Sequence, residues 1–357
     1  MKILYLYTEV MGYNVSVFES LASQYDASID VVHWDKNKKT PYTPSASSKK
    51  IRFHARSDFS AKSLRNFAIN LQPDLVYTSG WQDRGYRLAL QKLKSLGVPI
   101  VMGLDTQWTG SLRQRIGAKI IKYFYKTRYF SYAWVPGPLQ FECAARLGFD
   151  HAEIISNLLT GNADIFALTP AELNSEKTGV YPRRFLYVGR FTHSKGLDVL
   201  INAYKKYQAC CTDSWELICI GNGPLEECLR QVPGITVMPF ADQNTLVHWA
   251  RRVGALILPS RYEPWGVVVH EFAMTGLPLL LSNRVGSRHQ FLVNGLNGYS
   301  FDADSSDDLA EHMKKLTLLP DSRLLNMGHA SLRLAKVLSP SLAAASFVSA
   351  LHIRPHS

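Results

Sequence analysis

Short apolar runs and amphipathic stretches alternate along nearly the whole chain. KILYLY, SIDVVHW, DLVYTS and PIVMGL are runs of strand length, and stretches with helical spacing of apolar residues, such as 61–71 and 86–96, lie between them. Runs that are apolar throughout are typical of strands buried on both faces of a parallel sheet. The alternation therefore predicts an α/β chain built on doubly wound parallel sheets.

The alternation breaks once, over residues 157–184, where polar and turn residues predominate. A second series of strand and helix patterns then begins with FLYVG and WELICIG. A chain of 357 residues is long enough for two domains that each bury a core. We therefore expect two Rossmann-like domains, over residues 1–165 and 166–338, and a final helix over residues 339–357.

The net charge of +11 is concentrated in the N-terminal half. Residues 1–160 contain 21 Lys and Arg against 12 Asp and Glu, a balance of +9, which leaves 19 against 17, or +2, for the rest. A basic half suits an anionic partner, either nucleic acid or the anionic inner leaflet of a membrane. No recognition helix, finger or RNP motif supports nucleic acid, so we expect no nucleic-acid partner.

The five cysteines are odd in number and form no CxxC pair, so neither a disulfide framework nor a zinc site is indicated. The start, MKILYLYTEV, does not resemble a signal peptide, and no apolar run is long enough to span a bilayer. The histidines form no metal-ligand cluster. We expect a cytoplasmic protein that needs no metal.

Two carboxylates flank a predicted strand–loop–helix turn in PSRYEPWGVVVHEFAMTGLP, residues 259–278. Gly266 lies where the backbone can approach a ligand, and the amides of Val267 and Val268 would begin a helix, which favours anions. Glu263 precedes this helix and Glu271 lies within it, so the two can reach different parts of one ligand. The same residues alone fit a turn whose glutamates are simply solvated.

Two cations follow the strand predicted from RFLYVGRFTHSKGL, residues 184–197. Arg190 comes directly after Gly189 at the strand end, and Lys195 precedes the next helix. Open α/β sheets bind ligands at the carboxyl ends of their strands. The pair is therefore suited to neutralise a diphosphate, although each could be an ordinary surface cation.

With GNGP at 221–224 and the glycine-rich stretch that begins at Gly286, these motifs resemble the retaining GT-B glycosyltransferases with an E-x7-E motif, glycosyl transferases group 1. The resemblance covers most of the chain after about Asn157. It implies two Rossmann-like domains that face a cleft, with the final helix crossing back to the N-terminal domain. It also implies a nucleotide-diphosphate sugar donor, of UDP type, as co-substrate without a further cofactor.

The resemblance assigns roles to individual residues. Arg190 and Lys195 match the cations that hold the diphosphate and stabilise the leaving group. Glu263 matches the glutamate that faces the transferred sugar, and Glu271 the one that accepts hydrogen bonds from the ribose. Asp105, in PIVMGLDTQW, occupies the position of a histidine that often contacts that sugar, and it completes the catalytic set. The remaining donor-binding positions are Gly12, Gly189, Gly221, Gly223, Pro239, Phe240, Gly266, Val267 and Val268.

The stretch from Ser111 to Trp134 combines cations with apolar and aromatic residues at helical spacing. A basic amphipathic helix of this kind is typical of a membrane interface. The alternative is that its apolar side packs on the sheet. The predicted membrane or acceptor face consists of Arg113, Arg115, Lys119, Lys122 and Lys126.

The leading hypothesis is a retaining, metal-independent hexosyltransferase that uses a glycan or lipid-linked acceptor in bacterial lipopolysaccharide, capsule or exopolysaccharide biosynthesis, peripheral at the inner face of the cell membrane. Two alternatives share the fold that the resemblance implies. One is a nucleotide-sugar epimerase or hydrolase, and the other is a catalytically silent subunit that binds a sugar nucleotide.

Overall fold

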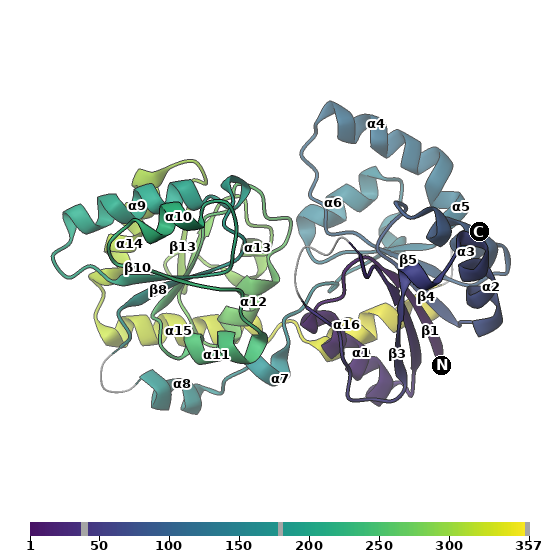
Figure 1. The fold of residues 1–357 in the computed structure, drawn as a ribbon, viewed down its shortest axis with the longest axis horizontal. Coiled ribbons are helices and arrows are strands. Elements are labelled where there is room, and N and C mark those ends of the chain that lie inside the picture. Colours follow the sequence, from purple (N-terminus) through teal and green to yellow (C-terminus); the bar gives the residue numbers. More distant parts are fainter. Residues whose placement is uncertain (37–41, 178–180, 354–357) are drawn as a thin grey trace. The chain divides into compact units, whose positions relative to one another are not determined.

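The computed structural model describes residues 1–36, 42–177 and 181–353 and divides the chain into two compact units (Figure 1). The N-terminal domain comprises Met1–Thr160 with Leu338–Ser357, and the C-terminal domain comprises Gly161–Val337. The first boundary thus lies after Thr160 rather than after residue 165. Gly161 already belongs to the second domain, because its N–H donates to Nδ1 of the buried His270 at 2.9 Å.

The N-terminal domain has a seven-stranded parallel sheet in the order β3-β2-β1-β4-β5-β6-β7. Its strands are β1 (Lys2–Tyr7), β2 (Ser28–His33), β3 (Ile51–Ala55), β4 (Leu75–Thr78), β5 (Ile100–Gly103), β6 (Tyr132–Trp134) and β7 (Ile154–Ile155). Side chains alternate between two core clusters, as in β1, where Ile3 and Tyr5 enter one and Leu4 and Leu6 the other. Helices cover both faces (Figure 1).

The helices of this domain include α1 (Gly12–Gln24), α2 (Ala61–Leu71), α3 (Arg84–Ser95) and α6 (Pro138–Arg146). The helix predicted over residues 111–130 consists of three segments, α4 (Leu112–Ile120), the π-helical η2 (Ile121–Lys126) and α5 (Thr127–Tyr129). Ser111 caps its start, since the hydroxyl accepts a hydrogen bond from the Gln114 amide at 3.3 Å.

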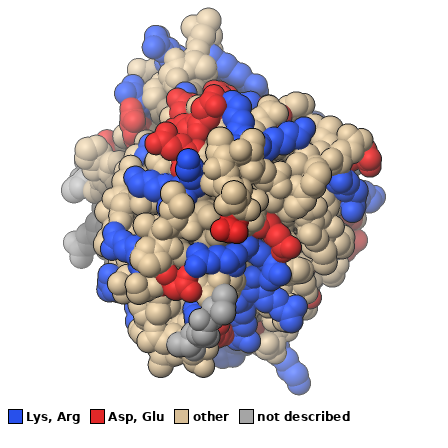
Figure 2. Space-filling view, turned by 90° about the vertical axis from the view of Figure 1, so that its left-hand side faces the viewer, with Lys and Arg blue, Asp and Glu red and all other residues tan. Residues whose placement is uncertain are grey.

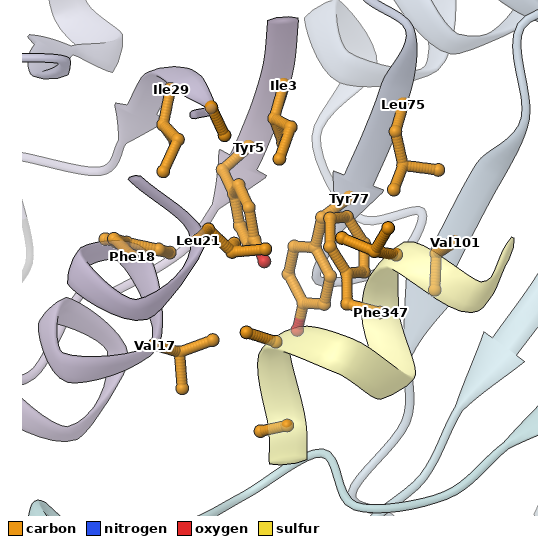
Figure 3. Close-up of a cluster of buried hydrophobic side chains, with 14 of the residues drawn as sticks. Ile3, Tyr5, Val17, Phe18, Leu21, Ile29, Leu75, Tyr77, Val101 and Phe347 are labelled. Carbon is orange, nitrogen blue, oxygen red and sulfur yellow. The ribbon is translucent and has the colours of Figure 1, made fainter. Parts of the chain in front are cut away.

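The final helix, α16 (Pro340–Val348), packs in the core of the N-terminal domain, as predicted (Figure 3). Its Phe347 ring lies 5.3 Å from Tyr5 and stacks on Trp134 at 5.2 Å, measured between ring centroids. Ser339 caps the helix by accepting a hydrogen bond from the Leu342 amide at 3.1 Å. The last residues of the predicted helix, 354–357, lie outside the described part of the chain.

The C-terminal domain has a six-stranded parallel sheet in the order β10-β9-β8-β11-β12-β13. Its strands are β8 (Arg184–Val188), β9 (Glu216–Ile220), β10 (Ile235–Met238), β11 (Ala255–Leu258), β12 (Leu279–Ser282) and β13 (Gly298–Phe301). The helices α9 (Leu197–Cys210), α10 (Glu226–Arg230), α11 (Gln243–Ala250), α12 (Val267–Met274), α13 (Arg288–Phe291) and α14 (Ser306–Thr317) connect or flank them. The strand order reverses between β8 and β11, and such switch points are where doubly wound sheets bind ligands.

Helices α7 (Ala163–Phe166), α8 (Pro170–Lys177), α13 and α15 (Asp321–Ala335) of this domain are missing from the sequence-based prediction. Helices α7 and α8 lie in the stretch expected to be irregular, where the Glu172 carboxylate caps α8 by accepting from the Thr169 amide at 2.7 Å. Helix α15 packs against α12, and Gly328 permits this approach, since a Cβ there would lie 2.4 Å from the Gly276 carbonyl oxygen.

By length and composition, the helical stretch 321–351 is apolar enough to cross a membrane. It contains two helices, however, and each packs in a different core: Leu324 and Met327 of α15 are fully buried in the C-terminal domain, and Phe347 of α16 in the N-terminal domain. Burial in a core accounts for the apolar composition of both helices.

Cations and carboxylates intermingle on the face of the protein seen in Figure 2. Ion pairs of the C-terminal domain such as Arg184–Glu216 and Lys206–Asp307, both at 2.6 Å, agree with the near balance of charge in the second half of the sequence.

Candidate functional site

Two residues predicted from separate motifs meet at the switch point of the C-terminal sheet. The Lys195 ammonium donates to Oε2 of Glu263 at 2.5 Å, and the Ser260 hydroxyl donates to the same oxygen at 3.4 Å. The side chains of Lys195 and Glu263 are only 16% and 13% exposed. A charge pair this shielded from water has stronger electrostatic interactions than a surface pair, both within itself and with a ligand.

Glycine allows the loop after β8 to approach the end of β11. Gly196 has a φ of 70°, and a Cβ there would lie 1.9 Å from the Pro259 carbonyl oxygen. The Ser194 carbonyl accepts hydrogen bonds from the amides of Arg261 and Tyr262 at 3.0 and 3.2 Å. These contacts fix Lys195 against the loop that carries Glu263.

Arg261 connects the same two loops through hydrogen bonds. It was not among the predicted site residues. Its guanidinium donates two hydrogen bonds to the Asp198 carboxylate at 2.6 and 2.8 Å, one to Asp304 at 2.7 Å, and one to the His193 carbonyl at 2.9 Å. These bonds from Arg261 hold the pKa of Asp198 below its ordinary value. An arginine fork can bridge carboxylates on different segments, but nothing next to Arg261 in the sequence indicates which carboxylates it binds.

Gly266 ends the second loop and begins α12. Its φ of 90° is left-handed, and it provides no side-chain cap, so the amides of Val267 and Val268 begin the helix. The first amides of a helix have no partner within it and favour an anion. The segment after β12 holds this loop in place, since the Ser287 hydroxyl donates to the Gly266 carbonyl at 3.2 Å and the Gly286 amide to the Glu263 carbonyl at 3.0 Å.

Glu271, on α12, is in a different environment from Glu263. It is 7% exposed and accepts a hydrogen bond from the side-chain amide of Gln243 at 3.2 Å. Burial raises the pKa of Glu271 to about 7, partly offset by that hydrogen bond. Gln243 was not predicted as a site residue, because nothing in the sequence indicates that α11 begins beside this carboxylate.

The loops after β8 and β9 also pack together through glycines. A Cβ on Gly221 would lie 2.0 Å from the Gly189 carbonyl oxygen, and one on Gly223 would lie 2.6 Å from the Phe191 carbonyl oxygen. Arg190 follows Gly189 with an exposed side chain, and its carbonyl accepts a hydrogen bond from the Tyr187 hydroxyl at 2.8 Å. These glycines and Arg190 thus lie at the same carboxyl edge of the sheet as Lys195.

Pro239 and Phe240 follow β10 at this edge. The Gly221 amide donates to the carbonyl of Met238 at 3.0 Å, which joins the ends of β9 and β10. Phe240 is 40% exposed. An exposed aromatic ring at a ligand-binding edge can stack on a nucleotide base.

Gly12 and Asp105 belong to the N-terminal domain. Gly12 is the buried first residue of α1, which follows β1, and Asp105 is an exposed residue shortly after β5. Burial, with a smaller contribution from the Asp105 carboxylate, raises the pKa of Tyr7 to about 12. This edge is therefore lined by neutral phenols, and Tyr7 and Tyr77 lie with rings 5.5 Å apart between centroids.

The cations predicted to form one face do not all lie together. Lys126 forms an ion pair with Glu153 at 2.6 Å, with side chains only 17% and 18% exposed, so it does not belong to that face. The other four, Arg113, Arg115, Lys119 and Lys122, are exposed. The apolar side of this helical stretch does not simply pack on the sheet either, because Ile116 and Phe124 are also exposed.

Over the described ranges, no group of three or more His, Cys, Asp and Glu side chains is arranged to hold a metal ion.

Comparison with known proteins relates the C-terminal domain to one family. Residues 170–330 match the profile described as "Glycosyl transferases group 1", and this range includes Arg190, Lys195, Glu263 and Glu271. The chain is 30% identical over 138 residues to the glycogen synthase of Mycobacterium tuberculosis (strain CDC 1551 / Oshkosh), which covers 37% of this chain and 32% of that protein. It is 26% identical over 204 residues to the D-inositol 3-phosphate glycosyltransferase of Pseudarthrobacter chlorophenolicus, covering 53% and 48%. The match thus spans a third to a half of these curated relatives.

Over its full length the chain resembles Anabaena Alr3699/HepE, solved in complex with UDP-glucose. The TM-score is 0.75 at 14% sequence identity, with 99% of each chain covered. The protein therefore has the GT-B fold, with two α/β domains that each contain a parallel sheet.

Proposed function

We propose that the protein is a retaining glycosyltransferase that moves a hexose-type sugar from a UDP-sugar to a glycan or lipid-linked acceptor. The observation that carries this proposal is the Lys195–Glu263 pair at the switch point, beside the N-terminus of α12. All of these elements lie in the segment that matches the glycosyltransferase family. The complexes of Anabaena HepE with UDP and UDP-glucose support the choice of nucleotide.

The donor diphosphate is held by Lys195, Arg190 and the amides of Val267 and Val268. An ammonium has three N–H donors, so Lys195 can bond a phosphate oxygen while it keeps Glu263. Both cations interact more strongly as the leaving diphosphate gains charge in the transition state, which lowers the barrier. In this proposal the cations take the role that a metal ion has in other transferases, and the reaction needs no metal.

Glu263 faces the transferred sugar and stabilises positive charge at the anomeric carbon while the bond from that carbon to the diphosphate oxygen breaks. The acceptor oxygen bonds to the same face, and its proton passes to the departing phosphate oxygen, so the configuration is retained. Glu271 and Gln243 bind the ribose hydroxyls, and Phe240 borders the base. For Gly12 and Asp105 we keep the roles that the family resemblance assigns to them.

The biological setting we propose is the synthesis of lipopolysaccharide, capsule or exopolysaccharide in the cytoplasm. A test of the chemistry begins with a thermal-shift panel of UDP, GDP, ADP and their sugar conjugates. A ligand at a hundred times its Kd adds about 2.7 kcal/mol to the stability of the folded state. We expect the UDP series to stabilise the protein and Lys195→Ala to abolish the shift. Lys206→Ala is the matched control, since Lys206 pairs with a carboxylate at the surface of the same domain.

Product analysis then separates the proposed reaction from its alternatives. A product with the anomeric configuration of the donor supports retention, and an inverted product contradicts it. Release of UDP or a new sugar epimer without any acceptor would indicate a hydrolase or epimerase. Tight UDP-sugar binding without turnover on any acceptor would indicate a silent subunit.

A further inference from the structure

Helix α4 and η2 expose large apolar side chains on their outer side. We call this set the outer stripe: it consists of Leu112, Ile116, Ile120, Tyr123 and Phe124, which are 73%, 53%, 45%, 67% and 68% exposed. The spacing puts these residues along one side of the helix. On its inner side, Ala118 and Ile121 are buried in a core cluster of the N-terminal domain. Burial of its inner side therefore anchors the helix to the domain. The exposed apolar residues of the outer stripe are not required for that packing.

Four cations flank the outer stripe, namely Arg113, Arg115, Lys119 and Lys122. Within the described residues, none of these four side chains has a carboxylate within 4 Å, in contrast to Lys126 with Glu153. The sequence from 106 to 141 contains no Asp or Glu at all. The positive charge beside the outer stripe is thus not neutralised locally.

A groove of about 700 Å³ runs along the cationic side of α4. Its lining includes Arg115, Lys119 and Lys122, together with Trp108, Arg146 and three members of the outer stripe, Leu112, Ile116 and Tyr123. The Arg146 guanidinium lies 5.0 Å over the Trp108 ring and also bonds the Glu142 carboxylate at 2.8 Å. The uncompensated charge of the groove therefore comes from α4 and η2. The groove combines cations with an aromatic wall, which suits the phosphate and glycerol of a lipid headgroup.

We propose that the outer stripe and its four cations dock the N-terminal domain on an anionic lipid bilayer. Apolar and aromatic side chains enter the headgroup–acyl boundary while the cations contact lipid phosphates. A second copy on the same surface would bring four cations against four cations across a two-fold axis. Nucleic acid would match the charge but leave five large apolar side chains in water. The bilayer interface satisfies both features, and this inference does not depend on the proposed enzymatic reaction.

The test is sedimentation of the full chain with vesicles of neutral phosphatidylcholine, alone and mixed with phosphatidylglycerol. We expect binding to the mixed vesicles and little to the neutral ones. Each cation near an anionic surface contributes about fivefold in partitioning, so Arg115→Gln with Lys119→Gln should weaken binding about 30-fold. The matched control is Lys62→Gln with Arg65→Gln, two exposed cations on α2 of the same domain, which should change binding little.

A second pair of variants tests the insertion of apolar side chains into the bilayer separately from the attraction of the cations. Ile116→Ser should weaken binding that survives at high salt, where electrostatic attraction is screened. Leu96→Ser is its control, because Leu96 is 55% exposed at the end of α3, close to the 53% of Ile116. All six substituted positions are exposed, and circular dichroism with thermal unfolding should show each of the four variants folded.

Three results would overturn the proposal. One is equal binding by the charge variants and the parent protein. Another is self-association without vesicles that Ile116→Ser abolishes, which would assign the surface to a second copy. The third is retention on single- or double-stranded nucleic acid in preference to mixed vesicles. UDP binding measured in parallel should be unchanged in every variant, so a failed membrane test leaves the proposed reaction untouched, and the reverse also holds.

Discussion

The carboxyl edges of the two sheets differ in chemistry although the sheets share a strand order. Counted from the first strand of each, both run 3-2-1-4-5-6, with one more strand in the N-terminal sheet. The C-terminal edge carries the shielded Lys195–Glu263 pair, whereas the N-terminal edge carries the partly buried Tyr7 and the buried Tyr77, whose pKa values are raised by burial. The topology therefore determines where a site forms, and the loops after the strands determine what it can bind.

The difference fits a division of roles in which the C-terminal edge binds an anion and the N-terminal edge binds a neutral ligand. Charged groups with fixed partners suit a diphosphate, whose charge persists through the reaction. Phenols that stay neutral, such as Tyr7 and Tyr77, suit hydroxyl-rich ligands, because a hydroxyl both donates and accepts hydrogen bonds and an aromatic ring packs on a sugar face. The predictions below test this division, beginning with the charged edge.

The largest expected effect is that of Lys195→Ala or Glu263→Gln on turnover. Each removes a group that interacts more strongly with the transition state, so we expect kcat to fall by about a thousandfold or more. Initial rates with a UDP-sugar and an acceptor measure the loss. If Glu263→Gln kept most of its activity, this carboxylate would have only a structural role, that of pairing Lys195.

The next largest effect concerns the close approach of the two loops. In Gly196→Ala, the new methyl group would overlap the Pro259 carbonyl oxygen at a left-handed backbone position, so we expect a loss of about 3 kcal/mol or more in unfolding free energy together with weakened UDP binding. Gly97→Ala is the matched control, since its φ is 83° but a Cβ there meets nothing within 4 Å. It should lose only about 1 kcal/mol. Equal losses, measured by urea unfolding, would mean that the backbone conformation alone matters.

The parts of the fold that the sequence predicted are those with a local signal. Alternating runs identified the strands, and adjacency in sequence connected Gly189 with Arg190 and Gly266 with the α12 amides. The helix α15 escaped prediction although its apolar residues recur at helical spacing, and no residue in α11 indicates that Gln243 reaches Glu271. Contacts between segments far apart in sequence, such as Arg261 with Asp198, depend on how loops pack and have no local signature.

The outer stripe and its neighbouring cations show another limit of prediction from sequence. Helical spacing predicted a cationic and an apolar stripe, but it did not identify which members of either stripe are shielded in the fold. Ile121 is buried and Ile120 is exposed, although they are neighbours in sequence. Likewise, helical spacing places Lys126 on the cationic side. Its ammonium instead pairs with the carboxylate of Glu153, which lies beyond the next strand and helix in the sequence.

An intermediate effect is expected for Glu271→Gln, and it depends on pH. Because burial raises the pKa of Glu271 from 4.5 to about 7, the folded protein holds a proton that the unfolded chain has released, so this group costs stability as pH rises from about 4.5 to about 7. Glu271→Gln removes that cost and should gain roughly 1–3 kcal/mol over the parent protein between pH 5 and pH 8. Unfolding curves at the two pH values measure it, and a constant difference would contradict the raised pKa.

The same substitution should weaken donor binding above pH 7. Ribose hydroxyls donate to an ionised carboxylate more strongly than to an amide, so we expect about a tenfold loss of affinity at pH 8 and a smaller one at pH 6. Calorimetry with UDP-glucose is suitable, since its diphosphate keeps its charge across this range. A loss that is independent of pH would show that Glu271 does not ionise when the donor binds.

The smallest effect should come from Asp105→Asn at the N-terminal edge. Asp105 is exposed and its side chain stays the same size, so the fold should be unaffected. If this edge meets the neutral part of the reaction, loss of one charge should lower kcat only about threefold to tenfold and leave the Kd for UDP unchanged. A loss as large as that of Lys195→Ala would break the division between a charged and a neutral edge, because it would require a carboxylate of the N-terminal domain to act on the developing positive charge together with Glu263. Kinetics and UDP binding measured on the same preparation therefore decide whether the two edges differ in chemistry or only in composition.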